Sequence, residues 1–390
     1  MKFKRFFLAL VSITAFIVSG TCWSTEAKDN FSYQPVKNDG KKWRIAYYQG
    51  GSSDNYYPYL SATVKGLIDI GWIERIEFPE IKSRDPEKLW EWLVKNIKSS
   101  YIEFIPDAFY NANWEQNKRA VIKKAILNRA NKKDINLIIA MGSWAGIDLA
   151  NNDHQTPVIV MSSTDPVASG IISSNSDSGY NHVFARVDPG RWERQIRVFY
   201  KTVGFEKLGI AYENSPLGRS YAAIDMIESV AKEKKFEIVR CFTKDDIPDR
   251  GLAEESVVKC FQDLATKADA IYVVQQLGVN PNSIPKLVSI TNKYRIPTFS
   301  QLGFQEVRAG FLMSITRQGG FIPVGRFLAI SMAKIFNGAK PRQLNQIFEE
   351  EPAIVLNLKT AELIGLYLTA EILAAADEIY PEIENIETAH

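Results

Sequence analysis

The amino-acid sequence predicts an α/β protein with two doubly wound parallel sheets, each at the centre of one lobe. Short strand-like runs alternate along the chain with segments whose apolar residues recur every three to four positions, which is typical of a parallel sheet covered by helices. Most of these runs are apolar without strict alternation, as expected for strands buried on both faces. The repeating units are too many for one open sheet, so two lobes are predicted.

The predicted elements follow one another in a regular order. Strands are expected at 44–48, 136–141, 157–161, 207–212, 236–241, 270–274, 297–300 and 310–315. Helices are expected at 59–70, 115–130, 191–202, 219–234, 254–265, 284–294 and 326–336. The stretch 363–379 also has helical spacing and precedes an acidic tail.

Three breaks in this pattern predict a multi-strand hinge, in which the chain crosses between the lobes three times. They lie near 169–180, 299–310 and 338–345. The predicted division is lobe one at 43–165 plus 300–342, lobe two at 170–299 plus 343–368, a linker at 28–42, and a C-terminal helix and tail at 369–390.

The N-terminus has the order of a secretory signal. Basic residues at 2, 4 and 5 precede an apolar run at 6–18, and small or polar residues follow. The run is too short to span a bilayer, which needs about 20 residues. Residues 1–27 are therefore predicted to be a signal peptide, and the mature chain to be periplasmic or otherwise extracytoplasmic. Two alternatives stay open: an N-terminal helix of the fold, and a lipid anchor at Cys22.

The composition limits the classes of partner. The chain of 390 residues has 47 Lys and Arg against 45 Asp and Glu, and the two become equal once residues 1–27 are removed. A neutral chain gives no reason to expect nucleic acid or an anionic membrane as a partner. Cys241 and Cys260 can pair in an oxidising compartment, but we favour two half-buried thiols, since the sequence does not give their separation.

The segment 79–115 is an addition to the alternating pattern. It holds an amphipathic helix-like stretch at 85–98, a strand-like run at 101–105, and aromatic residues that include Trp114. We interpret it as a packed elaboration of lobe one. The alternative is a lid or wall of a ligand site, because aromatic side chains also line pockets.

A search for catalytic motifs finds none. His154, His182 and His390 have no metal-ligand spacing, and no nucleophile elbow, P-loop or dinucleotide fingerprint is present. We interpret the acidic pair Asp245-Asp246 as part of a solvated loop. The sequence therefore predicts a protein that is not an enzyme and needs no cofactor or metal.

Polar side chains instead follow the strands, where ligands of parallel α/β proteins bind. The candidate ligand-binding residues are Tyr48, Gln49, Ser143, Trp144, Thr164, Asp165, Glu213, Asn214, Gln275 and Gln301. Ser143 opens a helix, so it is either a ligand contact or only an N-cap. Asp165 either accepts from a ligand amine or holds the crossover between the lobes.

Several segments resemble the ABC-transporter solute-binding proteins associated with tryptophan and tyrosine importers. They lie at 136–145, 164–170, 207–215, 268–273, 296–300, 325–341 and 354–366, and they include the Thr-Asp-Pro-Val and Asn-Leu-Lys-Thr-Ala elements. The resemblance implies a type I periplasmic-binding-protein fold that closes on its ligand by a hinge motion. It gives Ser143 a ligand contact, places Thr164 and Asp165 at the crossover, and assigns the second wall to the loops after 212 and at Gln275.

Some positions depart from that family. The neutral Gln301 stands where relatives often have an acidic residue suited to an amino-acid ammonium group. Gln275-Gln276 likewise replaces a pair similar to Thr-Asp, so an acidic residue is again missing. Trp144 is also bulkier than the usual residue. These departures weaken the assignment of an amino acid as the ligand.

The function predicted from the sequence is capture of a small solute, aromatic or otherwise hydrophobic, for an ABC importer. The expected partners are this solute and the permease and ATPase subunits, and the protein is expected to be a monomer. The alternative is a ligand-sensing module that passes its state to a membrane partner. An enzyme on the same fold is the third hypothesis, and it lacks a visible nucleophile or metal set.

Overall fold

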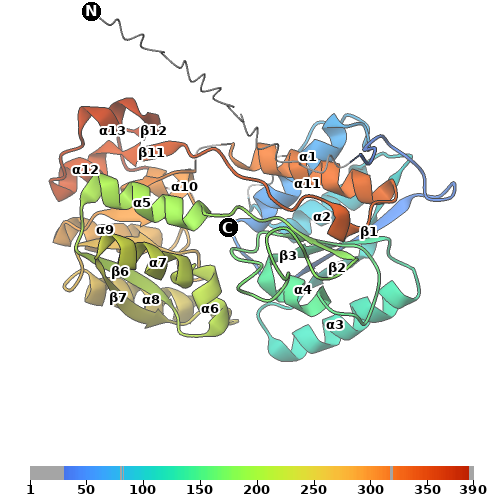
Figure 1. The fold of residues 1–390 in the computed structure, drawn as a ribbon, viewed down its shortest axis with the longest axis horizontal. Coiled ribbons are helices and arrows are strands. Elements are labelled where there is room, and N and C mark those ends of the chain that lie inside the picture. The colour runs from blue at the N-terminus through green and yellow to red at the C-terminus, as the bar shows by residue number, and fades with distance from the viewer. Residues whose placement is uncertain (1–29, 80, 82, 317–318, 386–390) are drawn as a thin grey trace, which may run out of the picture. The chain divides into compact units, whose positions relative to one another are not determined.

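The computed structural model describes residues 30–79, 81, 83–316 and 319–385. From Phe31 onward the chain forms one compact unit. This unit contains two sheets, which confirms the predicted α/β fold with two sheet-centred lobes (Figure 1). The predicted signal peptide at 1–27, together with Cys22, lies outside the described residues, and so does His390.

The first lobe is built on a five-stranded parallel sheet in the order β2-β1-β3-β4-β5. Its strands are β1 (Trp43–Gln49), β2 (Ile102–Asn111), β3 (Leu137–Met141), β4 (Val158–Met161) and β5 (Val183–Ala185). Every residue of β3 and β4 is buried, which explains why these strands are apolar without alternation.

Helices cover this sheet on both faces. They are α1 (Tyr56–Asp69), α2 (Pro86–Asn96), α3 (Gln116–Asn131), α4 (Gly142–Leu149) and α11 (Phe321–Phe336). Figure 1 shows α1 and α11 side by side, although they are more than 250 residues apart in the chain, and they pack directly against each other. None of the helices in the described part of the chain is both long and apolar enough to cross a membrane.

The segment at 79–115 contributes to the core of the first lobe. Trp90 from α2 and Phe104 from β2 are buried there and contact each other edge to face. Helix α2 begins at Pro86 because the side chain of Asp85 accepts a hydrogen bond from the backbone N–H of Glu87 (2.8 Å). The packed elaboration that we expected therefore accounts for α2 and β2.

The second lobe is built on a seven-stranded sheet in the order β12-β11-β10-β9-β8-β6-β7. The strands are β6 (Lys207–Glu213), β7 (Glu237–Thr243), β8 (Ala270–Val273), β9 (Thr298–Ser300), β10 (Met313–Ser314), β11 (Ile354–Asn357) and β12 (Ala376–Tyr380). The pair β10–β11 is antiparallel. The other five pairs of this sheet are parallel, as predicted, so this pair is a local exception in a parallel sheet.

The helices of the second lobe connect these strands. They are α5 (Arg191–Val203), α6 (Pro216–Tyr221), α7 (Ile224–Lys234), α8 (Arg250–Leu264), α9 (Ile284–Tyr294), α10 (Phe304–Arg308), α12 (Leu358–Ile364) and α13 (Ala370–Ala374). Two predictions need correction. The helix expected at 219–234 is divided between α6 and α7 by Ala223, whose φ is 51°. The stretch 363–379 is not one helix, because α12 and α13 are separated and β12 follows.

The strand pairing places the boundaries between the lobes at other residues than those expected from the sequence. The expected lobe one was 43–165 plus 300–342, but β5 pairs with β4, so the first sheet continues to Ala185. The strand β10 pairs with β9 and β11, so 300–314 belongs to the second sheet. The crossings accordingly lie between β5 and α5, between β10 and α11, and between α11 and β11.

Buried ion pairs join two of these crossings. Arg186, just after β5, contacts Glu350 (2.9 Å) and Asp188 (3.2 Å). Arg191 at the start of α5 contacts the same Glu350 (3.0 Å). Because Glu350 lies on the crossing that leads from α11 to β11, this network ties the first crossing to the third.

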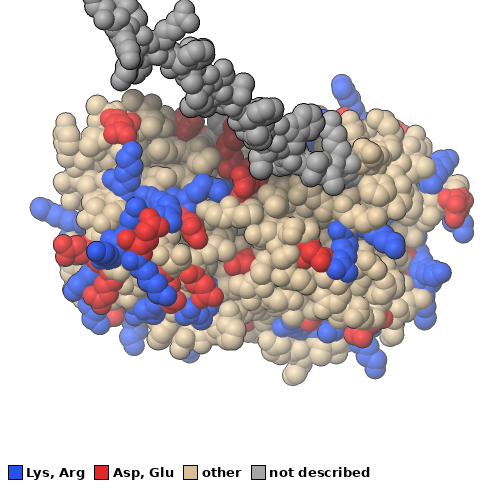
Figure 2. Space-filling view, in the orientation of Figure 1, with Lys and Arg blue, Asp and Glu red and all other residues tan. Residues whose placement is uncertain are grey.

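Charged side chains elsewhere on the surface also occur as neighbours of opposite sign. Figure 2 shows Lys and Arg intermingled with Asp and Glu on the visible face of the second lobe. Examples are Arg197 with Glu233 (2.6 Å) and Lys201 with Glu371 (2.8 Å).

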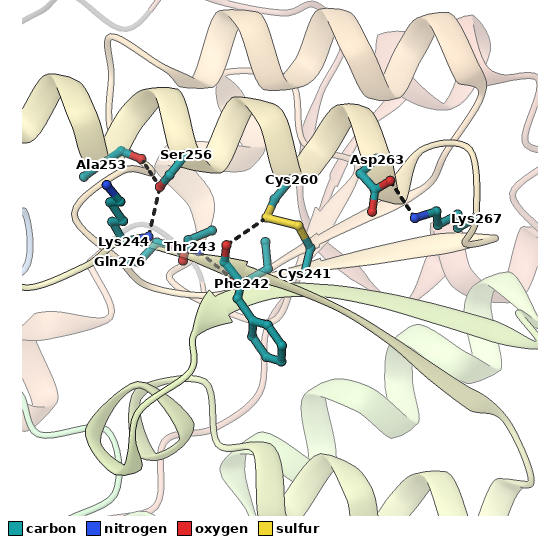
Figure 3. The surroundings of a disulfide bond; sticks show 11 residues. Cys241, Phe242, Thr243, Lys244, Ala253, Ser256, Cys260, Asp263, Lys267 and Gln276 are labelled. Carbon is teal, nitrogen blue, oxygen red and sulfur yellow. Dashed lines mark hydrogen bonds and ion pairs between the residues drawn. A yellow bond between two sulfur atoms is a disulfide. The ribbon is translucent and has the colours of Figure 1, made fainter.

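A disulfide joins Cys241 of β7 to Cys260 of α8, with the two Cα atoms 5.5 Å apart (Figure 3). The favoured interpretation of two half-buried thiols is therefore wrong. The bond closes a loop that contains Asp245 and Asp246, and it holds the end of β7 against α8.

Candidate ligand-binding site

A cavity of about 60 Å³ lies between the two lobes. Residues from the carboxyl ends of strands in both sheets line it, as expected for this class of fold. From the first lobe they are Ser52, Ser53, Asp54, Tyr56, Trp114, Ser143, Ser162 and Thr164. From the second lobe they are Tyr221, Asp245, Asp246, Arg250, Gln275, Gln276, Leu277, Val279, Asn280 and Leu302.

Direct hydrogen bonds between the lobes close the cavity. The side-chain amide of Gln275 donates to the Ser53 hydroxyl (3.1 Å) and accepts from the Asn55 amide (3.2 Å). On another wall, the indole Nε1 of Trp144 donates to Oδ2 of Asp246 (2.8 Å). These contacts hold the strand ends of one sheet against those of the other.

Glycines after β1 allow two tryptophans to approach the backbone. A Cβ at Gly50 would lie 2.6 Å from the Cβ of Trp144, and one at Gly51 would lie 2.4 Å from the ring of Trp114. The two indoles pack edge to face, with ring centroids 5.3 Å apart. The sequence Tyr-Gln-Gly-Gly therefore provides space for aromatic side chains and does not form a phosphate loop.

Gly142 meets a similar constraint at the start of α4. Its φ is +81°, and a Cβ there would lie only 1.9 Å from the hydroxyl oxygen of Tyr56. Tyr56 can therefore reach the cavity wall only because this position is glycine.

Two adjacent carboxyl groups, Asp245 and Asp246, line the cavity after β7. Asp245 is 5% exposed and accepts from the backbone N–H of Leu277 (2.7 Å). Burial raises the pKa of Asp245 to about 6. The pKa of Asp246 is raised further, first by burial and then by the charge of Asp245. The interpretation of this pair as a solvated loop is therefore wrong.

Other charged groups surround this pair. Burial raises the pKa of Asp54, which lines the cavity from the first lobe, although the nearby Arg250 acts in the other direction. Arg250 approaches Asp54 to 4.0 Å and Glu254 to 3.5 Å. Burial also raises the pKa of Glu213 at the end of β6.

Several residues predicted for the site lie at the cavity. Ser143, Thr164 and Gln275 line it directly, and Gln301 lines an adjoining recess. Ser143 is the second residue of α4 and makes no capping bond; its hydroxyl lies 2.9 Å from that of Ser163. Gln301 is engaged within its own lobe, because its side chain accepts from the backbone N–H of Gln275 (2.6 Å) and donates to the carbonyl of Tyr221 (3.0 Å).

The other predicted residues do not line the cavity. Tyr48 is buried below it and donates to Asp148 (2.7 Å), while Gln49 accepts from Tyr47 (2.8 Å). The Asp165 carboxylate accepts from the N–H groups of Val167 and Ala168 and so stabilises the turn that it begins. Trp144 contacts the site through Asp246, Glu213 accepts from Ser215 (3.3 Å), and Asn214 is exposed.

Sequence reasoning missed Tyr56, Tyr221, Asp245, Asp246 and Arg250. Asp245 and Asp246 follow a strand of the sheet, so the same strand-end rule that selected Gln275 would have selected them. Tyr56, Tyr221 and Arg250 lie at or next to helix ends, for which no periodic signal exists. In the described part of the chain no group of three or more His, Cys, Asp or Glu side chains is placed to hold a metal ion.

Comparison with known proteins identifies a family and solved structures of similar fold. The family described as ABC transporter substrate binding protein matches residues 91–380. No curated protein matches the chain in sequence.

Among solved structures, an ABC domain from Streptococcus pneumoniae in complex with L-Trp has 17% identity and a TM-score of 0.65, and the match covers 87% of this chain and all of that one. A conserved domain protein from Vibrio cholerae has 17% identity and a TM-score of 0.62 with the same coverage. A ligand-free, open substrate-binding protein with adhesive properties from Clostridium difficile has 18% identity, a TM-score of 0.55 and again the same coverage. These similarities confirm the type I periplasmic-binding-protein fold.

Proposed function

Because the chain belongs to the family of ABC transporter substrate-binding proteins, we propose that it captures a small organic solute outside the cytoplasm and delivers it to the permease and ATPase subunits of an ABC importer. The observation that carries this proposal is the cavity between the lobes, lined by the strand ends of both sheets. A ligand held there contacts both lobes, so its binding energy favours the closed arrangement over the open one.

The lining supports a solute with an apolar or aromatic part. Tyr56, Trp114 and Tyr221 present aromatic side chains, and Leu277, Val279 and Leu302 add aliphatic surface. Polar groups such as Ser143 and Thr164 orient the ligand by hydrogen bonds.

Native mass spectrometry of protein purified without refolding tests the proposal directly. The expected result is one small molecule per chain, released on denaturation. When added back at several hundred times its Kd, this molecule should stabilise the protein by about 3–4 kcal/mol. The proposal fails if neither a retained compound nor any of a panel of amino acids, peptides, nucleosides, sugars and lipids raises the melting temperature.

Two variants make the same experiment specific to the cavity. Ser143→Trp fills the space beside Ser163 and should abolish binding, while Asn214→Ala alters an exposed loop position outside the cavity and should leave it unchanged. Stimulation of a reconstituted permease–ATPase complex by the loaded protein then separates an importer component from a sensing module.

A further inference from the structure

The charged side chains that line the cavity indicate the charge of the ligand. We propose that the solute is an organic cation whose ammonium, amidinium or guanidinium group lies against Asp245 and Asp246. The inference rests on the proposed function, since it takes this cavity as the ligand site.

The lining is strongly unbalanced in charge. It contains the carboxyl groups of Asp54, Asp245 and Asp246 but a single basic side chain, Arg250. Arg250 is shared between Asp54 (4.0 Å) and Glu254 (3.5 Å). Among the described residues, neither Asp245 nor Asp246 has a basic partner within ion-pair distance, in contrast to the paired charges on the surface (Figure 2).

The hydrogen bonds of Asp246 leave part of the carboxyl group for a ligand. Trp144 Nε1 and the Tyr221 hydroxyl both donate to the same oxygen, Oδ2, each at 2.8 Å. Among the described residues, no hydrogen bond involves the other oxygen, Oδ1, so this oxygen can accept from a ligand. The Tyr221 bond lies within the second lobe and so orients the carboxyl group before a ligand arrives, whereas the Trp144 bond joins the two lobes.

Burial makes this arrangement costly without a ligand. A carboxylate removed from water without a counter-charge favours its protonated form, which is the direction of the raised pKa values of Asp245 and Asp246. An organic cation offsets this cost, and the rings of Tyr56, Trp114 and Tyr221, which line the same cavity, add cation–π attraction.

The neighbouring disulfide supports a fixed role for the pair. The disulfide between Cys241 and Cys260 is drawn in Figure 3. It closes a loop that contains Asp245 and Asp246 in the sequence. The Thr243 hydroxyl on the same strand donates to Gln276 (2.7 Å), another residue of the cavity lining. The carboxyl groups therefore project from a braced segment, as a preorganised binding site requires.

The charge of the ligand is read from a matched series of probes. Thermal shift and calorimetry compare 2-phenylethylamine, L-phenylalanine and 3-phenylpropionate, which share a phenyl group and differ in charge, and add 1,4-diaminobutane, glucose and zinc chloride. The molecule retained in native mass spectrometry is tested beside them.

We expect binding by a cationic probe or a cationic retained ligand, and at least tenfold weaker binding by 3-phenylpropionate. Strongest binding by a neutral or anionic compound, or by zinc alone, overturns the inference and leaves the proposed function intact. If nothing binds, both fall.

Two substitutions locate the interaction. Asp245→Asn and Asp246→Asn keep the size of the side chain and one oxygen acceptor, and each should weaken binding of the cation at least tenfold. The ligand-free variants should melt at or above the wild-type temperature, because a buried charge is removed, so lost binding cannot be ascribed to unfolding. Asp263→Asn on the exposed part of α8 is the matched control and should bind as the wild type does. Wild-type affinity in both cavity variants contradicts the inference.

Discussion

The indole Nε1 of Trp144 in the first lobe donates a hydrogen bond of 2.8 Å to Asp246 in the second. The guanidinium group of Arg119 lies over the face of this ring, 4.4 Å from its centroid. One tryptophan thus connects a helix of the first lobe to the acidic wall of the second.

This contact predicts that Trp144 contributes to ligand affinity through closure of the lobes. Trp144→Phe removes the donor and should weaken binding by about 1–2 kcal/mol, or roughly five- to thirty-fold. Trp144→Ala also removes the ring contacts and should weaken it more. Gln301→Ala, which acts on Gln275 within one lobe, should have the smallest effect by calorimetry. Wild-type affinity in Trp144→Ala and Gln301→Ala alike would refute this ordering.

Gly142 is predicted to be intolerant of any side chain. Gly142→Ala places a Cβ 1.9 Å from the Tyr56 hydroxyl in a left-handed backbone conformation, and the cost in unfolding free energy should be about 2–4 kcal/mol. Gly170→Ala is the matched control, because its φ is +72° and no atom lies within 4 Å of the added Cβ. Its cost should be about 1 kcal/mol. Equal melting temperatures for the two variants would contradict the prediction.

The disulfide is predicted to stabilise the second lobe. Cys241 and Cys260 are 19 residues apart, and a loop of that length corresponds to about 3 kcal/mol of unfolding free energy. Denaturation of Cys241→Ser/Cys260→Ser in guanidinium chloride should show this loss. Ligand affinity should fall as well, because the loop carries Asp245 and Asp246. The wild-type protein in reducing agent should behave like the variant, and a variant as stable as the oxidised protein would disprove the contribution.

The histidine pair of the first lobe predicts a loss of stability in acid. His154 and His182 are buried with ring centroids 4.6 Å apart, and burial followed by the proximity of His154 lowers the pKa of His182 to about 4. Between pH 6.5 and 4 the unfolded chain therefore binds protons that the folded chain does not, and stability falls as the pH falls. His182→Gln should reduce the loss of unfolding free energy between pH 6.5 and 4 by an amount on the order of 3 kcal/mol.

The raised pKa values of Asp245 and Glu306 have the opposite effect, because these groups stabilise the folded state as the pH falls. The unfolding free energy of the wild type therefore changes less with pH than the histidine pair alone would predict. The difference between the wild type and His182→Gln isolates the histidine contribution. Parallel stability curves for the two proteins between pH 4 and 6.5 would show that the pair does not titrate with folding.

Ligand binding is predicted to depend on pH through the acidic pair. The charged and titratable groups around it are Asp54, Tyr56, Arg119, Glu213, Tyr221, Arg250 and Glu254. A cationic ligand favours the ionised form of Asp245, whose pKa in the free protein is about 6. Affinity should therefore rise as the pH increases through 6, and binding should release protons. Calorimetry in buffers of different ionisation enthalpy measures this release, and its absence near pH 6 would count against the acidic contact.

The sequence was sufficient to predict the strands that are buried on both faces of a sheet. β3 and β4 consist of apolar residues without interruption, and their limits were predicted within one residue. β5, β11 and β12 were not predicted, because three buried residues, or a half-exposed edge such as Ala376–Tyr380, give no periodic signal. Their pairing depends on neighbours distant in the chain.

The site was predictable only where a strand end carries a polar side chain. This rule placed Ser143, Thr164 and Gln275 at the cavity. It also selected Tyr48, although both faces of β1 are covered, so that Tyr47 and Tyr48 are equally buried. Asp245 and Asp246 were rejected because adjacent acids usually face water. Their burial depends on contacts with residues distant in the chain, such as Trp144 of the other lobe and Leu277 of the same lobe.

The antiparallel contact of β10 with β11 has a consequence for how the molecule can be dissected. Met313 pairs with Leu356 and Ser314 with Val355, so the two strands form a hairpin whose connection happens to include α11, a helix of the other lobe. A tight turn could replace the connection that contains α11. A chain with this turn that starts at α5 should give a single-lobe miniprotein that folds autonomously. Such a miniprotein would carry half of the cavity wall, including the acidic pair, as an open surface accessible to spectroscopy.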